Sequence, residues 1–160
     1  MQKRTGPVEQ TAVNAAIKQI AHYKVFAQDK KRKETFFNHL LYRHLLQVEP
    51  RVTNQGIHSV TLVGETFRPE FCIRGGGEYP LFCVECKKLT DVTAKARFKE
   101  GLSQSIVYSH EYKCVLLVFY DFTEKANYSQ SFSVARSAEK KFIDSLWKQH
   151  RIKVVFVVPS

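Results

Sequence analysis

The feature that most restricts the fold is a pair of apolar runs, residues 115–120 and 154–158, in which polar residues do not alternate with apolar ones. Strands have this pattern when helices cover both faces of their sheet. Helical periodicity appears over residues 13–27, 37–48, 94–112 and 135–150, the first two being either separate helices or one bent helix. Strand-like segments cover residues 57–63, 67–73, 79–87, 113–121 and 152–158. These patterns predict an α/β fold, a three-layer sandwich with a central mixed β-sheet flanked by helices.

Length and composition favour one domain. A chain of 160 residues can bury one proper core, so we expect a single domain over residues 1–160, with residues 1–9 as a basic N-terminal tail. No apolar stretch approaches the roughly 18 residues that cross a bilayer, and the basic start is not followed by an apolar signal region. We therefore expect no membrane span, no Sec export, and a location in the cytoplasm, nucleoid or nucleus. The few cysteines lie in apolar sequence, as reduced thiols do.

The charge balance points to a polyanionic partner. The chain has 25 Lys and Arg against 15 Asp and Glu, a formal net charge of +10. Such an excess attracts nucleic acid, an acidic membrane surface or an acidic protein about equally. Charge alone therefore does not choose among these partners.

A predicted hairpin brings two carboxylates and a lysine together. Glu85 and Lys87 are two residues apart on a strand, so their side chains point to the same face. If the two strands pair with Glu70 opposite Glu85, the acids lie side by side. That register also gives two further facing pairs, Cys72 with Cys83 and Arg68 with Lys87.

The facing acids predict a hard metal ion. Two opposed carboxylates repel each other unless a cation lies between them, and oxygen ligands suit Mg²⁺ or Mn²⁺. Glu70 and Glu85 are thus candidate metal ligands. Lys87 could hold or help deprotonate an attacking water, or stabilise charge on phosphorus oxygens. With Glu70, Glu85 and Lys87 as catalytic residues, the reaction indicated is metal-assisted phosphodiester hydrolysis.

The segment Pro69-Glu70, followed by Glu85-Cys86-Lys87, resembles the Pro-Asp…Asp/Glu-x-Lys motif, PD-(D/E)xK, of the restriction-endonuclease-like nuclease superfamily. The element order over about residues 33–121 is similar to the αβββαβ core of that superfamily, here followed by a further helix and strand. This chain has Glu70 where the family usually has Asp. The resemblance implies a nuclease that uses Mg²⁺ or Mn²⁺, with DNA as the expected substrate ahead of RNA.

The resemblance also implies residues outside the hairpin. Many members have a Glu on the first core helix near the metal, and Glu34 matches it as a third metal ligand. Several have a Gln-x-x-x-Tyr motif on the helix after the catalytic strand, matched by Gln104 and Tyr108, and helical spacing puts Arg97 on the same side. That side is expected to face the phosphates. Further backbone contacts are expected from four basic residues, Lys88, Arg68, Lys31 and Arg32.

Other interpretations stay open. Glu70 and Glu85 could be edge carboxylates in surface ion pairs with Arg68 and Lys87. The alternative function is a catalytically inactive nucleic-acid-binding module of the same fold, and a third is a basic adaptor for an acidic protein. A zinc site at Cys83 and Cys86 is disfavoured, because strand alternation puts the two thiols on opposite faces. Many nucleases of this superfamily are dimers, so a homodimer is one expectation, although no segment identifies an interface.

Overall fold

The computed structural model describes residues 7–54, 59–73, 81–125 and 127–160. Its centre is a five-stranded sheet in the order β1-β4-β5-β6-β7. The strands are β1 (Val52–Asn54), β4 (Phe71–Ile73), β5 (Phe82–Leu89), β6 (Cys114–Asp121) and β7 (Ile152–Val157). β4 runs antiparallel to both of its neighbours, whereas β5, β6 and β7 are parallel to one another. The predicted mixed sheet is therefore confirmed.

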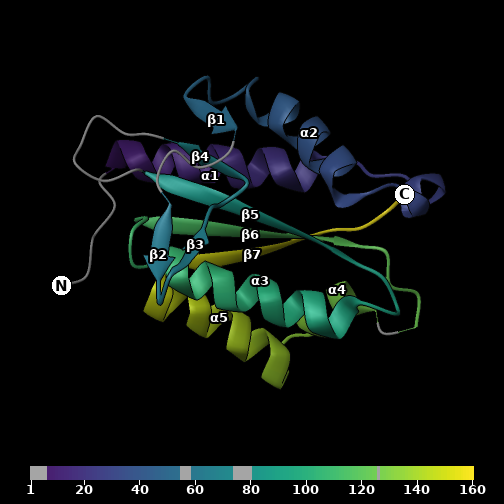
Figure 1. The fold of residues 1–160 in the computed structure, drawn as a ribbon. Coiled ribbons are helices and arrows are strands. Elements are labelled where there is room, and N and C mark those ends of the chain that lie inside the picture. The colour runs from purple at the N-terminus through teal and green to yellow at the C-terminus, as the bar shows by residue number, and fades with distance from the viewer. Residues whose placement is uncertain (1–6, 55–58, 74–80, 126) are drawn as a thin grey trace.

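Helices cover both faces of this sheet (Figure 1). One layer contains α1 (Pro7–His22) and α2 (Glu34–Leu45), and the other contains α3 (Ala94–Tyr108), α4 (Tyr128–Ser133) and α5 (Ala138–His150). A short 3-10 helix, η1 (Ala27–Lys31), separates α1 from α2, so the first two helical patterns are two helices. Because α1 begins at Pro7, the predicted tail of residues 1–9 is too long; residues 1–6 lie outside the described residues.

Each face of the sheet has its own hydrophobic core. Phe82, Val84 and Cys86 of β5 pack with α1 and α2, and Cys83 and Leu89 pack on the side of α3 and α5. All of β6 is buried, as its continuous apolar run predicts. β7 is less buried than we expected, because it is the edge strand and has an exposed lysine.

The segment before the hairpin differs from the prediction. Expected strands over residues 57–63 and 67–73 are replaced by β1, β4 and a separate two-stranded sheet of β2 (Val60–Leu62) and β3 (Glu65–Phe67). Pro69 follows β3, and proline has no amide hydrogen to donate to a neighbouring strand. The expected strand is therefore divided at this point. The expected polar connection over residues 122–133 includes the short helix α4.

The predicted hairpin register is confirmed where the two strands pair. Cys72 lies opposite Cys83, and Phe71 lies opposite Val84. Glu70 is the next residue outward from the last pair, toward Glu85. The predicted pairing of Arg68 with Lys87 is absent from the described strand pairs, because Arg68 lies between β3 and β4. Beyond Val84, β5 therefore has an edge that β4 does not cover.

The structure also bears on two features that the sequence disfavours, a zinc site at Cys83 and Cys86 and a membrane-spanning helix. Cys83 and Cys86 lie in different cores on opposite faces of the sheet, as predicted, so they cannot hold one zinc ion together. Burial raises the pKa of both thiols well above the ordinary value, which keeps them protonated. None of the helices in the described ranges is long and apolar enough to cross a membrane.

Candidate active site

Glu85 and Lys87 form a buried ion pair on the α3 side of β5. Their side chains are 2% and 5% exposed, and Lys87 Nζ donates to Glu85 Oε1. α3 lies very close at this point: a Cβ on Gly101 would be 3.1 Å from both Leu117 Cδ1 and Lys87 Cγ. Glycine is therefore what allows the helix to cover the lysine stem. The predicted shared face is confirmed, but these groups are not in a surface ion pair.

Glu70 lies beside this pair at the start of β4 and is half-buried. Burial raises the pKa of its carboxyl; the charge of Lys87 opposes that shift, and the charge of Glu34 adds to it. Asn38, a buried residue of α2, opposes the rise by a hydrogen bond to Glu70. Glu70 thus belongs to the same electrostatic cluster as the pair on β5.

Glu34 reaches this cluster from the other helical layer. It is the first residue of α2, and its Oε2 accepts from the backbone amide of Lys88 at 2.6 Å, beyond the part of β5 that β4 covers. The same oxygen accepts from Arg97 Nη2 of α3 at 2.5 Å. Glu34 therefore joins both helical layers across the open part of the β5 edge.

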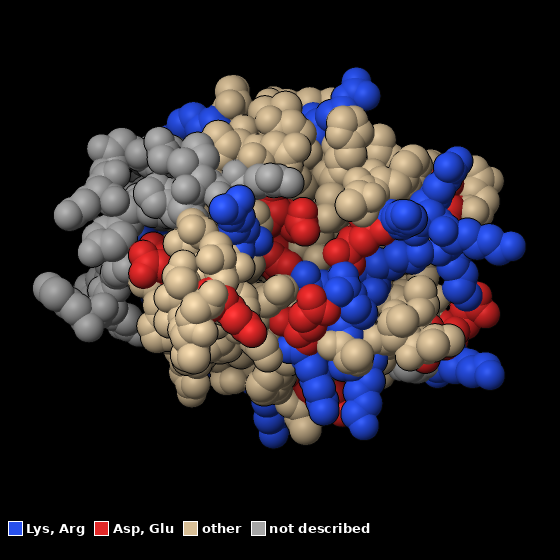
Figure 2. All heavy atoms as spheres, viewed as in Figure 1, with Lys and Arg blue, Asp and Glu red and all other residues tan. Residues whose placement is uncertain are grey.

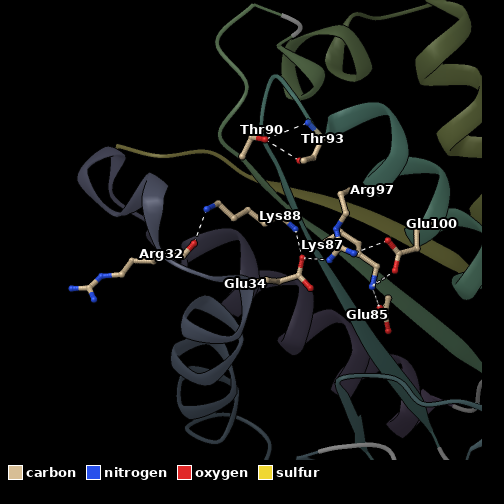
Figure 3. Close-up of polar contacts among 9 residues, drawn as sticks. All are labelled: Arg32, Glu34, Glu85, Lys87, Lys88, Thr90, Thr93, Arg97 and Glu100. Carbon is tan, nitrogen blue, oxygen red and sulfur yellow. Dashed lines mark hydrogen bonds and ion pairs between the residues drawn. The ribbon is translucent and has the colours of Figure 1, made fainter.

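Arg97 and Glu100 complete a chain of charged contacts (Figure 3). Arg97 Nη1 donates to Glu100 Oε2 at 2.6 Å, and Glu100 Oε1 is 3.8 Å from Lys87 Nζ. The network runs from Glu34 through Arg97, Glu100 and Lys87 to Glu85. Sequence reasoning missed Glu100, because an acidic residue three positions after an arginine on a helix is usually an ordinary surface pair.

The charged groups are visible from outside (Figure 2). Acidic side chains gather near the middle of this face, with Lys and Arg side chains beside and below them. Glu100 is 42% exposed and Arg97 is 30% exposed, whereas Glu85 is enclosed. A solute can therefore approach the network at Arg97 and Glu100, with the ion pair of β5 behind them.

The environment favours the protonated form of Glu85. Burial raises its pKa to about 7; the charge and hydrogen bond of Lys87 oppose the rise, and the nearby carboxylates of Glu70 and Glu34 add to it. Mutual repulsion of clustered acids is the arrangement that a bound cation relieves.

The donor set fits a hard divalent cation in part. Glu85 Oε2 is buried and has no hydrogen-bond partner of ordinary geometry within the described part of the chain, although the Tyr108 hydroxyl interacts with this carboxylate. A buried carboxylate oxygen left without a partner is costly, and an oxygen-seeking cation would satisfy it. No three His, Cys, Asp or Glu side chains of the described residues are already gathered as a metal site, however, and Glu34 is held by Arg97.

The three residues of α3 that were predicted to face the phosphates, Arg97, Gln104 and Tyr108, differ in their exposure and contacts. Arg97 lies in the charged network, but Tyr108 is fully buried and cannot touch a phosphate, which corrects its expected role. Burial raises the pKa of its hydroxyl, and the charge of Glu85 adds to that shift, so Tyr108 contributes to the surroundings of Glu85. Gln104 is half-buried, and its side-chain oxygen has no partner within the described residues.

The four other predicted basic contacts are not equivalent. Lys88 lies on the opposite face of β5 from Lys87 and donates to the carbonyls of Lys30 and Arg32, so its ammonium holds η1 in place. It also lies over two aromatic rings at 5.4 and 5.6 Å. Because its ammonium is held by these carbonyls, we expect Lys88 to stabilise η1 and to contribute little to phosphate binding. Lys31, Arg32 and Arg68 are exposed and accessible to a polyanion.

Comparison of this chain with models of protein families, with curated proteins and with solved structures finds no match.

Proposed function

We propose that the protein is a divalent-metal-dependent nuclease that hydrolyses phosphodiester bonds of nucleic acid, with DNA as the first substrate to test. One observation carries the proposal: the buried ion pair of Glu85 and Lys87 lies beside Glu70 and Glu34 at an uncovered strand edge. The resemblance to the PD-(D/E)xK motif names the same residues. The formal charge of +10 fits a polyanionic substrate.

Stability alone explains this pair poorly. Removing two charges from water costs several kcal/mol per ion, so a buried ion pair is often no better than apolar residues of the same size. The pair also leaves one oxygen of Glu85 without a hydrogen-bond partner of ordinary geometry in the described structure. Buried charges with shifted pKa values that face a cleft are typical of catalytic sites.

Each residue of the site has a role in this proposal. Glu70 and Glu85, with Glu34, would hold Mg²⁺ or Mn²⁺; when bound, such an ion activates water and neutralises charge on the phosphate oxygens. Lys87 orients or deprotonates the attacking water through its ammonium or amine group. Arg97 binds and orients the phosphate.

Cleavage assays test the proposal. Purified protein is incubated with plasmid, single-stranded DNA and RNA, each in EDTA, Mg²⁺ or Mn²⁺. We expect metal-dependent cleavage that Lys87→Met lowers about 100-fold or more, the usual contribution of a general acid or base. Lys99→Met is the matched control, because it removes one exposed charge from α3 outside the network and should cleave as wild type.

A folding defect must be separated from a catalytic one. Breaking a buried pair destabilises a protein by about 3–5 kcal/mol, so Lys87→Met could fail to fold. Glu70→Gln is the second variant, because Glu70 is half-buried and the amide keeps its shape. Folded Glu70→Gln without cleavage supports the proposal. Wild-type levels of cleavage by both variants would refute the assignment.

A non-catalytic nucleic-acid-binding module is the second candidate. It is favoured by the contact of Glu34 with Arg97 and by the absence of a gathered metal-ligand set among the described residues. It predicts salt-sensitive binding of nucleic acid, no cleavage with either metal, and unchanged binding by Glu85→Ala.

A further inference from the structure

Arg97 bridges two acids, Glu34 and Glu100, beside the proposed metal ligands. Its Nη2 donates to Glu34 Oε2 at 2.5 Å, and its Nη1 donates to Glu100 Oε2 at 2.6 Å. Glu34 is close enough to Glu70 and Glu85 for its charge to act on both. Oε2 of Glu34 also accepts from the backbone amide of Lys88, so Oε1 is the oxygen of this carboxylate through which a cation would bind. A cation bound there would lie close to the guanidinium of Arg97 and repel it.

Charge explains why Arg97 is held there and what would release it. Three acids cluster on this part of the sheet; Arg97 compensates the charge of Glu34 and Glu70, and Lys87 compensates that of Glu70 and Glu85. A divalent cation beside the same acids takes over that compensation and repels the guanidinium. Arg97 would then lose its attraction to Glu34, while Glu100, on its own helix, still holds it.

We propose that Arg97 is a cation-responsive clamp: without metal it occupies Glu34, and divalent-metal binding transfers it, still held by Glu100, from Glu34 to a phosphate of the substrate. This proposal rests on the proposed function. It couples metal and substrate, because the group that binds the phosphate becomes available only when the metal is present.

Glu100 is a positioning residue in this account. It lies three residues after Arg97 on α3, and its two oxygens face Arg97 at 2.6 Å and Lys87 at 3.8 Å. At 42% exposure it is the outermost acid of the network. Held by Glu100, the released guanidinium stays at the mouth of the site and does not extend into solvent.

The first measurement is Mn²⁺ binding without nucleic acid. The electron paramagnetic resonance signal of free Mn²⁺ is followed during titration of wild type, Arg97→Met and Lys99→Met at constant pH and ionic strength. Removing the competing guanidinium should tighten Mn²⁺ binding about five- to tenfold, the size of a partly exposed ion pair of about 1 kcal/mol. Lys99→Met removes the same charge from the same helix and should change the affinity less than twofold.

The second measurement is DNA binding, followed by fluorescence anisotropy with a phosphorothioate-substituted duplex that resists cleavage. With Mn²⁺, Arg97→Met should weaken DNA binding about fivefold, because a phosphate contact is lost. In EDTA it should weaken binding no more than Lys99→Met does, because Arg97 is then held by Glu34. If Arg97 had only a structural role, Arg97→Met would weaken the binding of both Mn²⁺ and DNA. If Arg97 is the clamp, the same variant binds Mn²⁺ more tightly and DNA more weakly.

The outcomes separate the two proposals. Wild-type protein that binds no Mn²⁺ would overturn the nuclease and the clamp together. Mn²⁺ binding by wild type that Arg97→Met leaves unchanged or weakens would overturn the clamp alone, as would equal loss of DNA binding in EDTA and in Mn²⁺. Glu100→Gln gives a further check, since it should weaken Mn²⁺-dependent DNA binding although it removes no positive charge.

Discussion

Gly101→Ala is a sharp test of how closely α3 lies on the sheet. A helix interior normally gains about 1 kcal/mol from this substitution. Here the new Cβ would lie 3.1 Å from Leu117 Cδ1 and from Lys87 Cγ, and 3.2 Å from Phe119 Cε1. Ordinary van der Waals contact begins at about 3.5 Å, so all three neighbours must give way.

Those neighbours have little room to move. Leu117 and Phe119 are fully buried, and the ring of Phe119 stacks between Phe98 and Phe156 with centroids 5.0 and 5.5 Å away. Overpacking of a tight core costs about 1–3 kcal/mol. A steric cost of about 2 kcal/mol less the propensity gain of about 1 kcal/mol leaves a net loss of about 1 kcal/mol.

Urea unfolding measures this change. The matched control is Ser103, an exposed residue of the same helix, where Ala should exceed Gly in stability by about 1 kcal/mol. Gly101→Ala should instead be less stable than wild type. If Gly101→Ala stabilised the protein as much as Ala exceeds Gly at position 103, the close packing would be refuted, and with it the account of how α3 covers Lys87.

Four other substitutions probe particular contacts. Lys88→Met should lose about 1–2 kcal/mol of stability because two carbonyls lose their donor, yet it should keep wild-type DNA affinity. The exposed Lys31→Met should weaken DNA binding and leave stability unchanged. Equal effects of the two variants on DNA affinity would contradict these different roles. Glu49 has a lowered pKa from hydrogen bonds to its arginine neighbour, so its contribution is present above the unfolded pKa and lost as pH falls through the folded one. In urea titrations Glu49→Gln should therefore cost about 1 kcal/mol at pH 7 and progressively less as the pH falls below the ordinary pKa of a glutamate, and a pH-independent difference would argue against the ion pair. Tyr108→Phe removes the hydroxyl near Glu85 and should slow cleavage about 10-fold while the protein stays folded, whereas an unchanged rate would exclude that role.

The central strands and the buried pair of Glu85 and Lys87 could be predicted from sequence because their signals are local. The apolar run of β6 indicates burial on both faces, and strand alternation alone puts Glu85 and Lys87 on one side. The hairpin register was a hypothesis that set Glu70 opposite Glu85, and the paired residues of β4 and β5 have that register.

The remaining features depend on contacts between distant segments. The short strands around Pro69 have too few residues for periodicity to separate the main sheet from the small one. Tyr108 is buried because both sides of α3 pack, one on β5 and the other, through Phe98, on the aromatic residues of α4. The role of Lys88 depends on carbonyls more than fifty residues earlier in the chain, which no local pattern reveals.

Diffraction from crystals soaked in Mn²⁺ and measured at the manganese absorption edge tests the central claim most directly. The account predicts an anomalous peak bound by oxygens of Glu70 and Glu85, with Glu34 turned away from Arg97. Crystals with no peak at these acids, and with Arg97 still bound to Glu34 at saturating Mn²⁺, would contradict it.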